Sequence, residues 1–157
     1  MSILGLDHAG VTVASLDRSL AFYEGLLGLA VHAVSLVESP EIDDVVGHPG
    51  ARLRIADMAL PAGGVLELIQ YELPEHDPVS ARHTQPGTSH IALRVTRLHE
   101  LHGRLVAAGA DLISTRPVPI TGSRAFAGVT VLYVRDPDGN VLELIERPAA
   151  SSSPAMP

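Results

Sequence analysis

The sequence predicts an α+β fold built from two paired βαβββ modules. The phrase LPAGGVLELIQ at Leu60–Gln70 returns as DPDGNVLELIE at Asp136–Glu146, with seven identical positions. Each half of the chain also shows the same order of a strand, a helix and three further strands. A repeat of this length indicates two similar modules that pair, because a solenoid needs a longer series of repeats. We expect a curved mixed sheet around a cleft, with the helices on the outer faces.

The first half begins with a strand that has one apolar and one polar face. Within Leu6–Val13, one face carries Ala9, Val11 and Val13 and the other carries His8, Gly10 and Thr12. Ser15 or Asp17 can cap the helix that follows, and Gly28 is a natural stop. The remaining elements expected in this half are strands at Ala30–Val37, Ala51–Met58 and Val65–Tyr71, and an acidic loop at Glu38–Gly50.

The second half repeats this order after a polar, proline-rich linker. The strand Thr88–Val95 carries His90, Ala92 and Arg94 on its polar face. Thr96 can cap a helix that ends at Gly109, and strands near Ala110–Ser114 and Gly128–Val134 precede the repeated phrase. The sequence therefore predicts a first module at 1–71, a linker at 72–87, a second module at 88–147 and a disordered tail at 148–157.

The composition argues against several classes of function. Aromatic residues make up 3% of the chain, which disfavours a platform for stacking bases or sugars, and a net charge of −7 without a Lys/Arg run disfavours nucleic acid as a partner. No apolar stretch approaches the roughly 18 residues that a membrane span needs. The N-terminus lacks a signal sequence, so we expect a cytoplasmic protein. Without cysteine, any metal must be bound by His and carboxylate side chains.

Four polar residues stand at matching positions in the two modules. His8 and His90 lie midway along the first strand of their module, and Glu67 and Glu143 lie midway along the last. A carboxylate in an otherwise apolar strand is costly to bury unless another group pairs with it. Two imidazoles and two carboxylates suit one divalent ion, such as Ni, Co, Zn, Mn or Fe. A single mid-strand His or Glu is more often a hydrogen-bonded core or surface residue, so the metal prediction rests on the repeat.

Three motifs together resemble a known family. They are LDHAGVTVASLDRSLAFYEGLLGL, GTSHIALRV and VRDPDGNVLELIE, and the resemblance covers nearly the whole chain. They are similar to the vicinal oxygen chelate superfamily, which includes glyoxalase I, methylmalonyl-CoA epimerase, extradiol dioxygenases and fosfomycin-resistance proteins. The resemblance implies paired modules around a metal cleft, with His8, Glu67, His90 and Glu143 as ligands. This ligand set is most similar to that of bacterial-type glyoxalase I.

The resemblance also implies an enzyme. A metal-dependent lyase or isomerase of glyoxalase I type acts through a metal-stabilised enediolate on a small 2-oxo or acyl-thioester substrate. By this resemblance Glu143 is both a ligand and the catalytic base, and Glu67 is the second catalytic carboxylate. Glyoxalase I carries an Arg four residues after its first ligand, where this chain has Thr12, and Arg94 stands at the equivalent place in the second module. Thr12 and Arg94 are therefore candidate substrate-binding residues, and Glu38–Gly50 is a candidate lid.

The same motifs leave two other functions open. An Fe(II) extradiol-type dioxygenase needs open metal positions and usually a further His or Tyr for acid/base chemistry. A metal-free drug-binding or resistance protein shares the fold but lacks the metal set. The resemblance further implies a homodimer that acts on a small-molecule substrate, and the four ligands come either from one chain or from two. The sequence leaves the substrate, the metal and this choice open.

Overall fold

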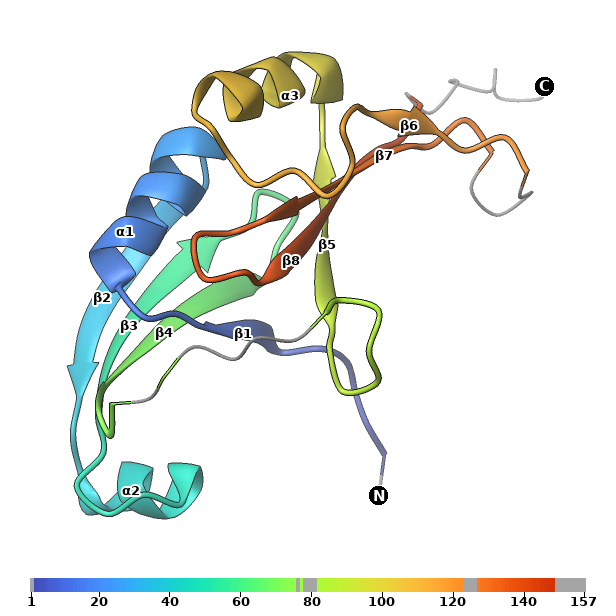
Figure 1. Ribbon diagram of the computed structural model, residues 1–157. Helices are drawn as coiled ribbons and strands as arrows, with labels where there is room; N and C mark the ends of the chain where they lie inside the picture. The colour runs from blue at the N-terminus through green and yellow to red at the C-terminus, as the bar shows by residue number, and fades with distance from the viewer. Residues whose placement is uncertain (1, 76, 78–81, 123–126, 149–157) are drawn as a thin grey trace. The chain divides into compact units, whose positions relative to one another are not determined.

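The computed structural model describes residues 2–75, 77, 82–122 and 127–148 (Figure 1). Contacts between residues divide the chain into two units. The first unit consists of Met1–Ser89 and Asp136–Asn140, and the second consists of His90–Arg135 and Val141–Pro157. Each contains one four-stranded mixed sheet, which confirms the α+β class and the two βαβββ modules. Apart from Pro148, the predicted tail lies outside the described residues.

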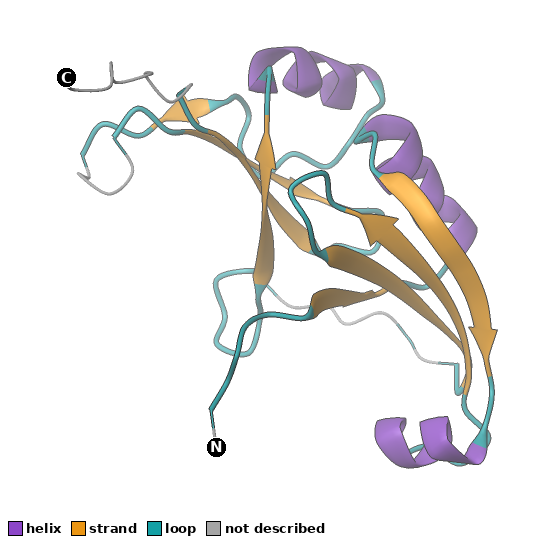
Figure 2. Ribbon diagram, turned by 180° about the vertical axis from the view of Figure 1, so that it is seen from behind, coloured by secondary structure: helices purple, strands orange, loops and turns teal. Residues whose placement is uncertain are grey.

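The first unit has its sheet strands in the order β1-β4-β3-β2. Figure 2 shows the strands in orange and the helices in purple. β1 is parallel to β4, whereas β3 is antiparallel to both of its neighbours, β4 and β2. A short α-helix, α1, continues directly into the π-helical turn η1, and a second helix, α2, follows β2. The elements are β1 (His8–Thr12), α1 (Leu16–Leu20), η1 (Ala21–Leu26), β2 (Ala30–Val37), α2 (Pro40–Val46), β3 (Arg52–Ala59) and β4 (Val65–Leu73).

The second unit repeats this topology with the order β5-β8-β7-β6. β5 is parallel to β8, and β8, β7 and β6 are antiparallel to their neighbours. Its elements are β5 (His90–Val95), α3 (Leu98–Ala107), β6 (Val118–Pro119), β7 (Thr130–Arg135) and β8 (Val141–Glu146). Among the described residues, no helix is both long enough and apolar enough to cross a membrane.

Each sheet buries one face beneath the helix of its own unit. In β4 the buried side chains alternate with half-exposed ones, so that Leu66 and Leu68 point to the core and Glu67 points away. The same alternation separates Leu142 and Leu144 from Glu143 in β8. The predicted division into an apolar and a polar face is therefore confirmed in both final strands.

The last strand of each module caps the helix of that module. The side-chain oxygen of Gln70 accepts a hydrogen bond from the Leu16 backbone N–H at 2.7 Å. At the equivalent position of the repeat, the Glu146 carboxylate accepts hydrogen bonds from the backbone N–H groups of Arg97 and Leu98. These side chains satisfy N–H groups that have no partner within the helix.

One predicted cap is confirmed and another is wrong. Ser15 caps α1 by accepting a hydrogen bond from the Arg18 backbone N–H at 3.4 Å, as expected. Thr96 does not cap α3, because the residue before this helix is Arg97, whose φ of 55° is left-handed. Glu146 supplies the acceptor there instead.

The segment predicted as an acidic loop contains a helix. Ser39 caps α2 through its hydroxyl, Pro40 occupies the first turn, and Gly47 ends the helix with a φ of 71°. The Asp43 carboxylate then accepts hydrogen bonds from the backbone N–H groups of Gly50 and Ala51, both at 2.8 Å. The prediction of a loop at Glu38–Gly50 was wrong. The segment has no regular apolar face that would indicate a helix, and local caps stabilise the helix instead.

The strand predicted near Ala110–Ser114 does not form. Leu112 makes only an isolated bridge to Val134, and the N–H groups of Ile113 and Ser114 both donate to the Tyr133 carbonyl. Two donors on one carbonyl are incompatible with a regular ladder. The strand β6 lies further along the chain and pairs with β7 through Val118 and Pro119.

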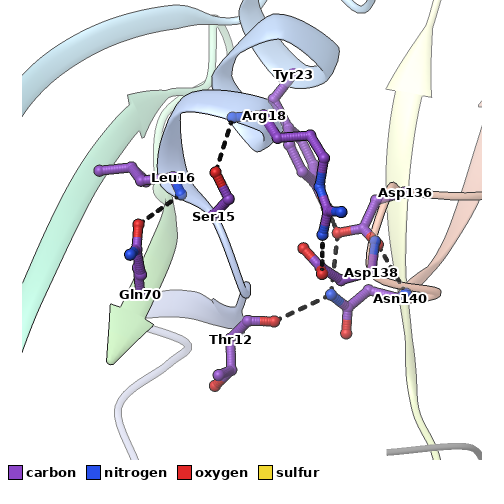
Figure 3. Close-up of polar contacts among 9 residues, drawn as sticks. All are labelled: Thr12, Ser15, Leu16, Arg18, Tyr23, Gln70, Asp136, Asp138 and Asn140. Atoms are coloured by element: carbon purple, nitrogen blue, oxygen red, sulfur yellow. Dashed lines mark hydrogen bonds and ion pairs between the residues drawn. The ribbon is translucent and has the colours of Figure 1, made fainter. Parts of the chain in front are cut away.

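A buried carboxylate holds the turn Asp136–Asn140, which belongs to the first unit (Figure 3). Asp136 is 4% exposed and accepts hydrogen bonds from the backbone N–H groups of Asp138 and Asn140 and from the Asn140 amide. It also accepts a hydrogen bond of 3.0 Å from the hydroxyl of Tyr23, which is fully buried in η1. Burial, followed by the charge of Asp136, raises the pKa of Tyr23, so this hydroxyl remains a donor.

Two further contacts join the same turn to the first unit. Arg18 forms an ion pair with Asp138, and the Asn140 amide donates to the Thr12 carbonyl at 3.1 Å. Figure 3 shows Arg18, from α1, and Thr12, at the end of β1, facing the residues of the turn. The turn is thus anchored to both the first strand and the first helix.

We expect Asp136→Ala to lower the free energy of unfolding by about 3 kcal/mol, because it leaves the buried Tyr23 hydroxyl and the turn N–H groups without an acceptor. Tyr23→Phe removes one of these hydrogen bonds and should cost about 1 kcal/mol. Urea unfolding followed by circular dichroism measures both changes. The control is Asp111→Ala, which removes a carboxylate from an exposed ion pair with Arg135. A loss for Asp136→Ala no larger than that of the control would contradict this account.

Candidate functional site

The first candidate pair lies on the parallel strands β1 and β4. His8 is in register with Val65, and Gly10 is in register with Glu67. Residues in register share a face of the sheet, so His8 and Glu67 both lie on the face turned away from the helix. Their side chains meet there, with Nε2 of His8 at 3.5 Å from Oε2 of Glu67.

The second candidate pair repeats this arrangement on β5 and β8. His90 is in register with Val141, and Ala92 is in register with Glu143. Nε2 of His90 lies 3.1 Å from Oε2 of Glu143. In both units the residue opposite the Glu is therefore the second residue after the His. The sequence repeat thus corresponds to a repeat in strand register, which brings the same two side chains together twice.

The residues opposite the two glutamates are small. Gly10 stands opposite Glu67 and Ala92 opposite Glu143, so no long side chain from the first strand covers either carboxylate. A Cβ atom added at Gly10 would lie 3.3 Å from Cδ1 of Ile69, which is a tight contact. Glu67 and Glu143 keep 25% and 17% of their side-chain surface exposed, so both remain reachable from solvent.

Asp7 orients the imidazole of His8. Its carboxylate lies 2.9 Å from Nδ1 of His8, while Nε2 faces Glu67. The hydrogen bond that the His8 imidazole donates to Asp7 and, after it, the charge of Glu67 raise the pKa of His8. A carboxylate on one imidazole nitrogen is a common way to direct the other nitrogen toward a metal ion.

Tyr133 lies beside the second pair. It is in register with Glu143 across β7 and β8, and its ring centroid is 5.4 Å from that of His90. Partial burial, followed by the charge of Glu143, raises the pKa of Tyr133. This residue was not predicted from the sequence, because only the antiparallel register places it next to Glu143.

The corresponding position of the first unit is occupied by Asp57. This residue is in register with Glu67 across β3 and β4. The two pairs are therefore alike in their His and Glu but differ in the neighbouring strand, where one has a carboxylate and the other a phenol. Asp57 was also missed, for the same reason as Tyr133.

Thr12 and Arg94, the two predicted substrate-binding residues, lie on the expected faces. Thr12 is in register with Ile69 and shares its face with His8, and Arg94 is in register with Ile145 and shares its face with His90. Both residues are exposed. The carbonyl of Thr12 is engaged by Asn140.

The spacing within each pair fits metal coordination. Metal–ligand bonds of about 2.1 Å at right angles put adjacent donor atoms about 3 Å apart, close to the 3.1 and 3.5 Å found here. One imidazole nitrogen and one carboxylate oxygen per pair suit a divalent ion of borderline hardness. Among the residues that the structure describes, no three His, Asp or Glu side chains form a group that could hold a metal ion.

Comparison with known proteins gives a consistent family. The family model described as the Glyoxalase/Bleomycin resistance protein/Dioxygenase superfamily matches residues 5–144. A virulence protein from Salmonella typhimurium is 28% identical over 146 residues, which cover 92% of this chain and 85% of that protein. A 2-epi-5-epi-valiolone epimerase from Actinomyces sp is 28% identical over 152 residues, which cover 94% of this chain and 82% of the epimerase.

Solved structures share the fold. A glyoxalase family protein from Bacillus cereus superposes with a TM-score of 0.77 at 24% identity, covering 95% of this chain and 97% of the other. A glyoxalase I mutant from Zea mays superposes with a TM-score of 0.64 at 19% identity, covering 90% of this chain and 45% of the maize chain.

We expect Asp7→Asn to lower the pKa of His8 in metal-free protein, because it removes the carboxylate that favours the charged imidazolium. An NMR titration of the His8 ring protons, assigned with His8→Gln, measures this pKa. The interaction with Asp7 stabilises the fold at pH values below the unfolded-state pKa, and this contribution is lost as the pH rises through the folded-state pKa. Asp17→Asn, a change in an exposed aspartate paired with Arg54, is the control. An unchanged His8 pKa in Asp7→Asn would contradict the assigned hydrogen bond.

Proposed function

Because this chain belongs to the Glyoxalase/Bleomycin resistance protein/Dioxygenase superfamily, we propose that it is a metal-dependent enzyme of glyoxalase I type. It acts as a lyase or isomerase on a small 2-oxo or acyl-thioester substrate. The reaction removes a proton from the carbon next to a carbonyl group and passes through an enediolate.

The observation that carries this proposal is the duplicated His–Glu pair. Each pair offers one nitrogen and one oxygen donor at a separation that suits neighbouring positions around a divalent ion. His8, Glu67, His90 and Glu143 would hold the ion together. When bound, the ion supplies Lewis-acid stabilisation of the negative charge that develops on the substrate oxygens.

Glu143 is the base in this proposal. A carboxylate oxygen of Glu143 takes the proton from the substrate carbon and returns it to the same or the neighbouring carbon, so no net proton is consumed. Its side chain is less exposed than that of Glu67, at 17% against 25%, and its cross-strand neighbour is Tyr133. This partly dry setting reduces competition from water for the proton. Glu67, which faces Asp57, serves as the second carboxylate.

The place to which the proton returns distinguishes an isomerase from an epimerase. Return to the neighbouring carbon moves the carbonyl group, whereas return to the opposite face of the same carbon inverts its configuration. The relative named 2-epi-5-epi-valiolone epimerase, which matches 94% of this chain, supports including epimerisation among the reactions tested. Thr12 stands where glyoxalase I has an Arg, and this difference weakens the case for glutathione adducts as substrates.

A second candidate is an Fe(II) extradiol-type dioxygenase. Tyr133 favours it, because such an enzyme usually needs an additional acid/base group near the metal and Tyr133 lies beside both His90 and Glu143. A ligand set of four protein side chains disfavours it, since a catechol and oxygen both need open metal positions. We therefore rank this activity below the enediolate reaction.

The metal identity, the homodimer and the cytoplasmic location stay predictions. The two His–Glu pairs lie in different units of the chain. Under this proposal the four ligands come either from both pairs of one chain or from one pair of each chain in a homodimer. Mixing His8→Ala with His90→Ala protein distinguishes these cases. Recovery of metal binding in the mixture indicates a site shared between chains.

We expect metal analysis of the protein purified without chelator to find about one divalent ion per chain, and we expect His90→Ala and Glu143→Gln to lose it. Exchange of the substrate α-proton with deuterated solvent should fall by about a hundredfold or more in Glu143→Gln, because this variant loses both the base and a metal ligand. The screen includes hemithioacetals of 2-oxoaldehydes and acyl-CoA epimers. His99→Ala, which removes a histidine from α3, is the control and should retain both metal and exchange.

Different outcomes separate the candidate functions. Bound iron with oxygen uptake on a panel of catechols would replace the proposed reaction by ring cleavage. Stoichiometric metal without α-proton exchange or oxygen uptake would argue against both enzymes. Protein that binds apolar drugs and takes up no metal would support the drug-binding alternative.

A further inference from the structure

Strand β2 forms an open edge of the sheet in the first unit. The edge strands of the two described sheets are β1, β2, β5 and β6. Strands β1 and β5 carry the candidate histidines, and β6 has only two residues, one of which is Pro119. Figure 1 shows β2 along the outer side of its sheet. The backbone N–H and C=O groups on the open side of a long edge strand are a template for pairing with another strand.

The buried row of this sheet continues to an uncovered residue on β2. Leu68 and Ala56 are fully buried, and Val34 continues their row in register. Helix α1 packs on β3 and β4. Beyond them Val34 is 54% exposed, and Leu36, on the same face of β2, is 55% exposed. The edge therefore presents two large apolar side chains next to the core, in addition to its backbone groups.

The strand lacks the residues that usually keep an edge from pairing. Native edge strands are protected by charged side chains, by Pro or by bulges. Strand β2 contains no Asp, Glu, Lys, Arg or Pro. Its one bulge lies near its start, between Val31 and Ala33. From Ala33 to Val37 the pairing with β3 is regular, so this run of β2 is suited to accept a further strand.

The regular run is self-complementary about its central residue, Ser35. Two identical antiparallel strands related by a twofold axis can pair with the same residue of each strand at the centre. With Ser35 at the centre, Val34 of one copy lies opposite Leu36 of the other, and the axis repeats this contact. Both contacts join exposed apolar side chains on the helix-covered face of the sheet, which is the favourable kind of cross-strand pair.

Charge also favours a second copy of this chain as the partner. The chain has a net charge of −7, so two copies repel each other wherever their acidic surfaces meet. An uncharged strand avoids this repulsion. Just outside the regular run, the same alignment brings His32 of one copy near Glu38 of the other at both ends. His32 is exposed, and the side chain of Glu38 is 64% exposed, so both can make this contact.

We propose that β2 is a dimer interface, in which two copies pair antiparallel about Ser35 and join their first sheets into one continuous sheet. The twofold axis closes this pair, so β2 offers no edge to a third copy. The inference goes beyond the proposed function, because it gives the predicted homodimer a surface that contains none of the His–Glu pairs. A short strand pairing is a small interface, so the dimer dissociates reversibly, with a Kd of about 10 µM.

The variant Ser35→Cys tests the alignment, because the chain has no cysteine of its own. Residues opposite each other in an antiparallel pair have Cα atoms about 4.5 or 5.5 Å apart, which a disulfide can span. We expect oxidised glutathione to cross-link Ser35→Cys at least about tenfold faster than Val106→Cys. Val106 lies on α3 and is 54% exposed, like Val34. Non-reducing electrophoresis of the full-length protein measures both rates.

Charged variants test the apolar contacts. Val34→Arg should raise the dimer Kd at least about tenfold, because the new arginine faces Leu36 of the other copy. Leu36→Glu should do the same. The double variant Val34→Arg/Leu36→Glu should recover most of the affinity, since each arginine then faces a glutamate of the other copy. Sedimentation equilibrium measures Kd, and circular dichroism checks the fold. Val106→Arg is the matched control and should dimerise like the wild type.

Three outcomes would overturn the inference. The first is a wild-type protein that stays monomeric at about 100 µM, well above the expected Kd. The second is a dimer in which Ser35→Cys cross-links no faster than Val106→Cys, which would mean that another surface forms it. The third is a folded Val34→Arg protein that dimerises as well as Val106→Arg. If Val34→Arg does not fold, the cross-linking rates decide. None of these outcomes bears on metal binding, because the His–Glu pairs lie on other strands.

Discussion

The parallel pairing between the first and last strands of each module is the constraint on which the site depends. It connects β1 to β4 and β5 to β8. The His and the Glu of each pair are more than fifty residues apart in the sequence. A shift of one residue in this register would turn Glu67 or Glu143 toward the hydrophobic core, where an unpaired carboxylate is costly. The leucines on either side of each glutamate oppose such a shift, because they are fully buried in the observed register. Core packing and site geometry therefore stabilise the same strand alignment.

The repeated phrase combines several physical roles in a few residues. Its glycine sits at positive φ in the turn before the strand, its leucines fill the core, and its glutamate lies half-buried on the opposite face beside the histidine. Its last residue, Gln70 or Glu146, caps the helix of the same module. In the second copy the turn itself is part of the first unit, where Asp136 accepts the hydrogen bond of the buried Tyr23. This phrase is thus a structural unit as well as a source of ligands.

The two modules differ at two positions near their His–Glu pairs. The position across the sheet from the glutamate is Asp57 in the first unit and Tyr133 in the second, and the position four residues after the histidine is Thr12 in one and Arg94 in the other. The first unit surrounds its histidine with carboxylates, whereas the second has a phenol and a guanidinium on the same face as its histidine. Under the proposed function, both units supply metal ligands, Glu143 of the second unit takes the substrate proton and Glu67 of the first serves as the second carboxylate.

Much of this could be predicted from the sequence, because strand alternation and internal repetition are local patterns. The α+β class, the two modules and the outward direction of His8, Glu67, His90 and Glu143 follow from residues that are close together in the chain. Helix α2 was missed because its caps act without an apolar periodicity, and the strand near Ala110–Ser114 was wrong because pairing there depends on β7. Tyr133 and Asp57 are neighbours of the glutamates only because of the antiparallel pairing of β7 with β8 and of β3 with β4. The distances of 3.5 and 3.1 Å within the His–Glu pairs depend on the parallel pairing of the first and last strands of each module. Sequence alone determined which side chains face the site, since that depends on the parity of each strand; the tertiary structure decided which of them meet, since that depends on how distant strands align.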